Sequence, residues 1–259
     1  MTMAATLTIR ELGKTYPAAG GRPSVTVLDG VSFEVAAGSI VSVVGLNGSG
    51  KTTLLRIIAG LEPPSQGSIR IDGRPPVPGG SDGIGLVSQD VALLPWRTVR
   101  DNIALGLELK GLPAARRAEL AREYEEAFGL ADWSNRYPKE LSGGMRQKAA
   151  IARTLAAGPG VVLMDEPFSA LDCQTRNRMQ AFLLDVWAKR RVTILFVTHN
   201  IEEAALLSDR IVVITPKPGR VEEIVPVALP RPRLRTDTAV NMLRSRIFET
   251  LGRLGRDGR

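Results

Sequence analysis

The sequence predicts an α/β fold built on a parallel or mixed sheet, and three observations predict it. Short apolar runs rich in β-branched residues occupy residues 39–44, 161–164 and 192–197, as buried strands of parallel sheets do. Helical patterns separate these runs, and a glycine-rich loop lies between the first run and a helix. The residues that follow such strands meet at one edge of the sheet, where α/β proteins bind ligands.

The glycine-rich loop reads Gly-Leu-Asn-Gly-Ser-Gly-Lys-Thr over residues 45–52 and fits G-x-x-x-x-G-K-[ST] at every fixed position. Residues 53–60 repeat apolar side chains at helical spacing and end at a glycine, which predicts a helix after the loop. Loop amides and a helix N-terminus attract phosphate. Lys51 can then reach the β- and γ-phosphates, and the Thr52 hydroxyl can bind Mg²⁺. The alternative is a plain glycine-rich turn with a chance lysine.

The second run ends in Asp165-Glu166, and the third ends in Thr198-His199. Asp165 is suited to hold Mg²⁺, and Glu166 is a candidate general base for the attacking water. His199 is the only histidine of the chain, and its imidazole could hydrogen-bond the γ-phosphate or the water. Two surface acids and a structural histidine are the alternatives, which the phosphate loop disfavours.

These motifs, together with Leu-Ser-Gly-Gly-Met at residues 141–145, resemble the nucleotide-binding subunit of ABC transporters over about residues 5 to 230. The resemblance implies an α/β P-loop NTPase cassette with a mixed or parallel sheet core, an antiparallel β subdomain and a helical subdomain. It implies an ABC ATP-binding domain at 5–235, with the helical subdomain inserted at about 95–155. Residues 236–259 remain as a basic C-terminal helix or tail.

The resemblance also implies that ATP and Mg²⁺ are the cofactors and that two copies share each ATP. Tyr16 would stack on adenine, and the signature residues would meet the phosphate held by the other copy. Met145 replaces the commoner Gln of the signature. The implied catalytic residues are Lys51, Gln89, Glu166 and His199, and the implied metal ligands are Thr52, Gln89 and Asp165. The implied nucleotide-binding residues are Tyr16, Gly45, Asn47, Gly48, Ser49, Gly50, Lys51, Thr52, Thr53, Ser142, Gly143, Gly144 and Asp172.

The remaining segments predict further elements. Within residues 5–44 we expect strands with turns at 18–21 and 37–38, and another proline-rich turn at 75–80. Further strands are predicted at 68–71, 83–88 and 210–215, the last followed by a hairpin-like stretch to 227. Further helices are predicted at 99–106, 114–128, 145–155, 172–189 and 238–251.

Composition limits the compartments and partners that suit this chain. The single cysteine, Cys173, forms no intramolecular disulfide, which fits a reducing compartment. No apolar run has the roughly 20 residues that span a bilayer, and residues 1–5 do not resemble a signal peptide. The net charge is +7, and from Pro216 onward ten Lys or Arg stand against five Asp or Glu. This tail lacks interleaved aromatic residues, so we expect a solvated or lipid-facing surface rather than a nucleic-acid partner.

The resemblance implies integral-membrane permease subunits as partners, a solute-binding protein acting indirectly, and a peripheral location at the cytoplasmic face of the inner membrane. Three features are similar to the importer branch that serves nitrate, taurine and aliphatic sulfonates, which also includes relatives for thiamine precursors. They are residues 93–99, residues 141–148, and residues 215–220 followed by 229–233. The alternative is a soluble ABC ATPase of iron–sulfur assembly or repair type without a transport role. Trp96 is either a half-buried turn residue or an anchor for a partner helix.

Overall fold

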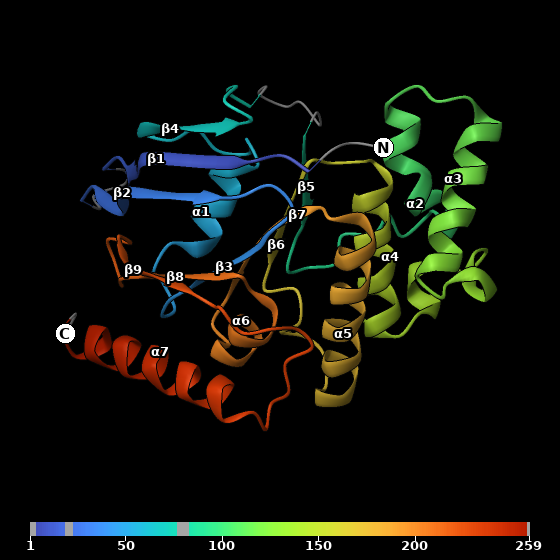
Figure 1. Ribbon diagram of the computed structural model, residues 1–259. Helices are drawn as coiled ribbons and strands as arrows, with labels where there is room; N and C mark the ends of the chain where they lie inside the picture. Colours follow the sequence, from blue (N-terminus) through green and yellow to red (C-terminus); the bar gives the residue numbers. More distant parts are fainter. Residues whose placement is uncertain (1–3, 19–22, 77–82, 258–259) are drawn as a thin grey trace.

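The structure is a computed structural model that describes residues 4–18, 23–76 and 83–257 (Figure 1). The predicted turns at 18–21 and 75–80 lie partly outside these ranges, as does most of the N-terminal segment judged for a signal peptide.

A six-stranded sheet forms the centre of the molecule, in the order β5-β6-β7-β3-β8-β9. Its strands are β3 (Ile40–Val44), β5 (Ile84–Val87), β6 (Val161–Asp165), β7 (Thr193–Thr198), β8 (Arg210–Ile214) and β9 (Val221–Pro226). The first five in spatial order are parallel, and β9 runs antiparallel to β8. Every residue of β3, β6 and β7 is buried, as parallel strands covered on both faces require. The predicted mixed sheet is confirmed.

A second sheet contains β1 (Leu7–Tyr16), β2 (Val25–Val35) and β4 (Gln66–Ile71) in the order β2-β1-β4. Both pairings are antiparallel, so the antiparallel β subdomain is confirmed. Helix α1 (Lys51–Ile58) packs in one apolar cluster with residues of both sheets, and Figure 1 shows it between them.

Four helices gather beside the central sheet (Figure 1). They are α2 (Val99–Leu109), α3 (Ala114–Ala127), α4 (Gly143–Ala156) and α5 (Cys173–Arg190), and two 3₁₀ turns, η1 (Ala131–Trp133) and η2 (Pro138–Glu140), precede α4. The caps define where three helices begin, because Thr98, Ser142 and Asp172 each accept a backbone N–H of the first turn. Helix α4 therefore starts at residue 143 rather than at the predicted 145.

Two helices complete the fold. The short α6 (Ile201–Leu207) follows β7 and was not predicted, because seven residues are too few for a clear helical period. Helix α7 (Thr238–Asp257) extends six residues beyond the predicted end. Leu251 and Leu254 stay buried against the β8–β9 side of the sheet, which accounts for the extension. Among the helices of the described ranges, none combines the length and apolar character that a membrane crossing needs.

Candidate nucleotide site

The predicted chemistry converges at one edge of the central sheet. The phosphate loop follows β3, Gln89 lies just after β5, Glu166 follows β6 and His199 follows β7. These four strands are parallel neighbours in the order β5-β6-β7-β3, so their carboxyl ends face the same side. The sequence prediction of a site at this edge agrees with the strand order.

The phosphate loop turns tightly into α1. Gly50 caps α1 with φ +89°, a left-handed conformation that side chains disfavour. A Cβ on Gly45 would lie 2.7 Å from the Ser49 hydroxyl oxygen. Ser49 is itself buried, and its Oγ has no partner among the residues described. Asn47 and Gly48 are exposed at the tip of the loop, so the loop forms a close backbone cradle of the kind that binds phosphate.

Lys51 points back into this cradle. Its Nζ donates to the Gly45 carbonyl at 2.9 Å and to the Leu46 carbonyl at 3.0 Å. Burial lowers the pKa of Lys51, while the Glu166 and Asp165 carboxylates oppose this shift. The ammonium group thus lies in the loop, within the field of both acids.

Thr52 and Asp165 form the part of the site that fits a divalent cation. The Thr52 hydroxyl donates to Asp165 Oδ1 at 3.3 Å, and burial raises the pKa of Asp165 while Thr52 opposes the rise. Hydroxyl and carboxylate oxygens suit Mg²⁺, which keeps one or two protein carboxylates and takes further ligands from substrate phosphate and water. The described residues contain no cluster of three or more His, Cys, Asp or Glu that could hold a metal alone.

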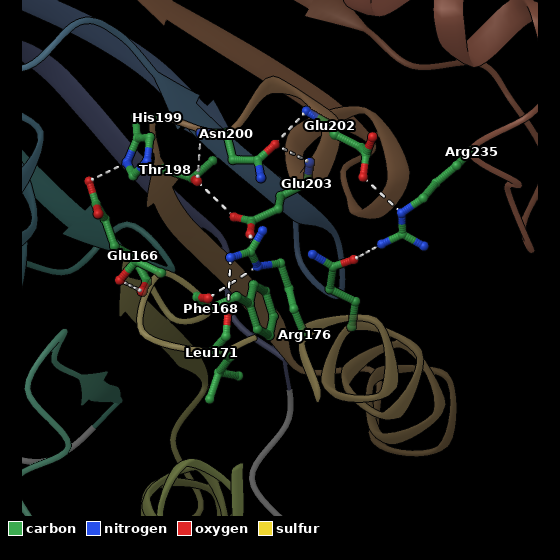
Figure 2. A network of polar contacts seen from close by, with 12 residues as sticks. Glu166, Phe168, Leu171, Arg176, Thr198, His199, Asn200, Glu202, Glu203 and Arg235 are labelled. Carbon is green, nitrogen blue, oxygen red and sulfur yellow. Dashed lines mark hydrogen bonds and ion pairs between the residues drawn. The ribbon is translucent and has the colours of Figure 1, made fainter. Parts of the chain in front are cut away.

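Glu166 and His199 meet just beyond the carboxyl ends of the paired strands β6 and β7 (Figure 2). His199 Nδ1 lies 3.0 Å from Glu166 Oε1. Glu166 has φ +44°, an uncommon conformation for a residue other than glycine, and the Ser169 hydroxyl donates to its carbonyl at 3.0 Å. Strained backbone of this kind is concentrated at functional sites.

Tyr16 and Gln89 lie at the margins of the site. The Glu62 carboxylate, which accepts from the Tyr16 hydroxyl, raises the pKa of Tyr16, and a hydrogen bond with Thr53 opposes the shift. Tyr16 is therefore next to α1, with the Lys14 ammonium 5.0 Å from its ring centre. The side chain of Gln89 is exposed in the bend after β5.

The signature residues lie elsewhere. Ser142 and Gly143 are exposed at the start of α4, and a Cβ on the buried Gly144 would lie 2.6 Å from Thr175 Cγ2 of α5. Asp172 accepts the Thr175 backbone N–H at 3.0 Å. Within the described ranges, no hydrogen bond or ion pair joins residues 142–144 to the phosphate loop.

Sequence reasoning missed three residues that adjoin the site: Glu62, Arg176 and Glu203. Glu62 contacts Tyr16, and Arg176 and Glu203 lie between the residues that follow Glu166 and those that flank His199. A signal existed for Glu203, because it stands one helical turn after His199 and three residues after Asn200, which caps α6. Arg176 and Glu62 carried no comparable local signal.

Comparison with known proteins agrees with this geometry. The family described as "ABC transporter" matches residues 28–169. A nitrate import ATP-binding protein of Synechocystis is 44% identical, covering 86% of this chain and 83% of its own length. A taurine import ATP-binding protein of Sinorhizobium fredii is 47% identical, covering 85% and 82%. An aliphatic sulfonates import ATP-binding protein of Bacillus cereus is 40% identical, covering 94% and 95%.

A solved structure of similar fold is a dimeric ATP-binding cassette in a post-hydrolysis state, bound to ADP and phosphate. It superposes with a TM-score of 0.74 at 30% identity, covering 86% of this chain and all of that one. The family match spans more than half of the chain. The three relatives are 40–47% identical over more than four fifths of this chain. The chain therefore belongs to the ABC transporter family, as one of its ATP-hydrolysing, ATP-binding proteins.

Proposed function

We propose that this chain hydrolyses ATP in pairs to power an importer, and one observation carries the proposal. Lys51, Thr52, Asp165, Glu166 and His199 gather around the phosphate loop. The signature residues Ser142–Gly144 are held apart at the start of α4, with Ser142 and Gly143 exposed. A helix N-terminus of this kind attracts a phosphate, and in the proposal that phosphate belongs to ATP on a second copy. The dimeric state of the similar cassette supports this arrangement.

The catalytic roles follow from the contacts. Glu166 directs the attacking water and takes its proton, and His199, which contacts Glu166 at 3.0 Å, holds the water or the γ-phosphate. Lys51 offsets the negative charge that develops on the phosphate oxygens. Thr52, Asp165 and Gln89 are the side chains that would hold Mg²⁺. When bound, Mg²⁺ neutralises charge on the β- and γ-phosphates.

The exposed loop after Gln89 is proposed to meet the permease. Trp96 is 71% exposed, although it adjoins the cap of α2, so the half-buried interpretation of this residue is wrong. An exposed aromatic side chain next to the start of a helix is well suited to anchor a partner helix. The helical subdomain at about 95–155 would then transmit closure of the dimer to the permease, with the chain peripheral at the cytoplasmic face of the membrane.

The names of the relatives support the choice of solute. Nitrate, taurine and aliphatic sulfonates are small solutes that each carry a nitrate or sulfonate group with negative charge, and the three relatives that carry these names match 85–94% of this chain. We propose an importer of such nitrate or sulfonate solutes, fed by a solute-binding protein. The import names favour transport over the alternative of iron–sulfur assembly or repair.

The shared site is tested with an ATP-trapped dimer. Glu166→Gln with ATP should elute as a dimer, because ATP stays unhydrolysed in the closed pair. Glu166→Gln/Ser142→Arg should elute as a monomer but still bind ATP, since Ser142 serves the other copy. The matched control is Glu166→Gln/Ser68→Arg, which places the arginine at an exposed serine on β4. This variant should still elute as a dimer. A tenfold loss of ATP affinity in the Ser142 variant would place this residue in the site of its own chain and contradict the proposal.

The solute is tested by growth. A deletion strain without a redundant transporter should fail to use at least one of taurine, an alkanesulfonate or nitrate as its sole sulfur or nitrogen source. Normal growth on all three would exclude nitrate and sulfonate solutes and leave the ATPase proposal intact.

A further inference from the structure

The loops that carry Glu166 and His199 leave neighbouring strands, β6 and β7. The two side chains meet beyond the last residues of these strands, so their contact depends on what holds each loop outside the sheet. A polar network joins the two loops (Figure 2), and its central members were not predicted as site residues.

Glu203 holds the loop of His199. This residue lies on α6 and is 3% exposed, and its Oε2 accepts the Thr198 hydroxyl at 2.7 Å. The Thr198 hydroxyl oxygen in turn accepts the Asn200 backbone N–H at 3.0 Å. Glu203 is therefore connected to the residues on both sides of His199.

Arg176 holds the loop that follows Glu166. Its Nη2 donates to the Leu171 carbonyl at 2.9 Å and its Nε to the Phe168 carbonyl at 3.3 Å. The same Nε lies 3.8 Å from Glu203 Oε1. One guanidinium group thus links the 168–171 segment to the carboxylate that fixes the His199 loop.

The charges in this network depend on each other. Burial raises the pKa of Glu203, while the Thr198 hydrogen bond and the Arg176 charge oppose the rise. A buried carboxylate is strongly disfavoured unless hydrogen bonds and a counter-charge compensate for its lost hydration. Loss of either partner should therefore disturb both loops.

We propose that Glu203 and Arg176 are positioning residues that set His199 against Glu166. Glu203 acts through Thr198, and Arg176 acts through the Phe168 and Leu171 carbonyls. The effect on turnover rests on the function proposed above for Glu166 and His199, whereas the geometric part does not.

The geometric part is tested by proton NMR of the untagged chain without nucleotide. His199 is the only histidine, so its imidazole C2 proton gives one resonance. In Glu203→Gln, the amide oxygen can still accept from Thr198, but the amide NH₂ then faces the Arg176 donor. This resonance should shift or split in Glu203→Gln and in the double variant Glu203→Gln/Arg176→Gln. Glu202→Gln is the matched control, because Glu202 immediately precedes Glu203 on α6 and also pairs with arginines, Arg235 and Arg244. Its resonance should stay at the wild-type position.

The catalytic part is tested by steady-state ATP hydrolysis. Glu203→Gln should lower kcat about tenfold, within the hundredfold that an ångström of misplacement can cost. KM for ATP should stay within about threefold, because Lys51 and Tyr16 lie outside the network. The double variant should lose no more than about threefold beyond the worse single variant, since the pair acts as a unit. If Arg176→Gln does not fold, Glu203→Gln and the double variant are compared directly.

An unmoved histidine resonance, an unchanged kcat in Glu203→Gln, or a hundredfold loss in the double variant would each overturn the proposal. If the wild-type chain hydrolyses no ATP, the proposed function fails instead, and the resonance alone still decides whether the pair positions His199.

Discussion

Two groups of residues in this chain are expected to meet ATP phosphate, and they differ in burial. The phosphate-loop group comprises residues 45–52 with Asp165, Glu166 and His199, and the signature group comprises residues 142–144. Lys51 and Asp165 of the phosphate-loop group are 6% and 8% exposed, whereas Ser142 and Gly143 of the signature group are exposed. Lys51 and Asp165 have hydrogen-bond partners in their own chain, and the signature group presents a helix start outward. Most buried polar groups find hydrogen-bond partners inside the chain, whereas an exposed group is free to bind a partner from outside. The contrast supports the proposal that the first group is preassembled within one chain and that the second is completed by a second copy.

The largest effect is expected from removing the proposed general base, Glu166, from the phosphate-loop group. Glu166→Gln keeps the side-chain length and the contact with His199 but cannot take a proton, so kcat should fall about 10²–10⁴-fold. ATP affinity should stay near the wild-type value, because the cradle and Lys51 are unchanged. Single-turnover hydrolysis and equilibrium ATP binding measure the two quantities. Near wild-type turnover at saturating ATP would show that another group is the base.

The next effect concerns Asp165, whose substitution is expected to lower turnover but to increase the stability of the fold. Asp165→Asn should lower turnover at least a hundredfold, since charge stabilisation at a metal-bound phosphate is worth several kcal/mol. Because burial raises the pKa of Asp165, the folded chain binds this proton more tightly than the unfolded chain, and ionisation opposes folding. This destabilisation is absent below the unfolded pKa and fully present above the folded pKa.

Asp165→Asn should therefore raise the Tm of the nucleotide-free chain at neutral pH, and the difference should disappear in acid. Differential scanning fluorimetry from pH 4 to 8 measures it. A variant less stable than the wild type at pH 7.5 would show that Asp165 stabilises the fold through Thr52 and Lys51, contrary to this expectation.

A smaller effect concerns the signature group and two neighbouring glycines. A Cβ at Gly143 would lie 3.7 Å from Leu171 Cδ2, an ordinary contact, but a Cβ at Gly144 would lie 2.6 Å from Thr175 Cγ2. Gly143→Ala should fold normally and lose about tenfold in turnover, because it adds bulk only where the second copy is expected. Gly144→Ala should instead lower the Tm by forcing α4 and α5 apart. Equal loss of Tm in both variants would contradict the assignment of Gly143 to an outward surface.

The sequence predicted the residues of the phosphate-loop group better than the residues that position them, Arg176 and Glu203. The buried β-branched runs before Gly45, Asp165 and His199 predicted three parallel strands and the edge at which their ends meet. The antiparallel sheet and the distant role of Ser142 came from family resemblance. Alternation of apolar and polar residues marks a strand but does not identify its pairing partner, and contacts between copies leave no local period. Arg176 and Glu203 were missed because an ion pair 27 residues apart in the chain depends on how α5 and α6 pack.

The smallest effect is expected at Tyr16, which lies at the margin of the nucleotide site. Its hydroxyl is tied to Glu62 and its ring has the Lys14 ammonium 5.0 Å from its centre, so the remaining ring surface is what adenine could stack on. Tyr16→Ala should weaken ATP binding by about fivefold, equivalent to about 1 kcal/mol for one stacked base. Tyr16→Phe, which keeps the ring and loses the hydroxyl, is the matched control and should bind ATP within about twofold of the wild type. Affinity for inorganic triphosphate should be the same in all three proteins, because it offers phosphates to Lys51 and no base to the ring. An equal loss for ATP and triphosphate would mean that Tyr16 supports α1 through Thr53 rather than contacting the base.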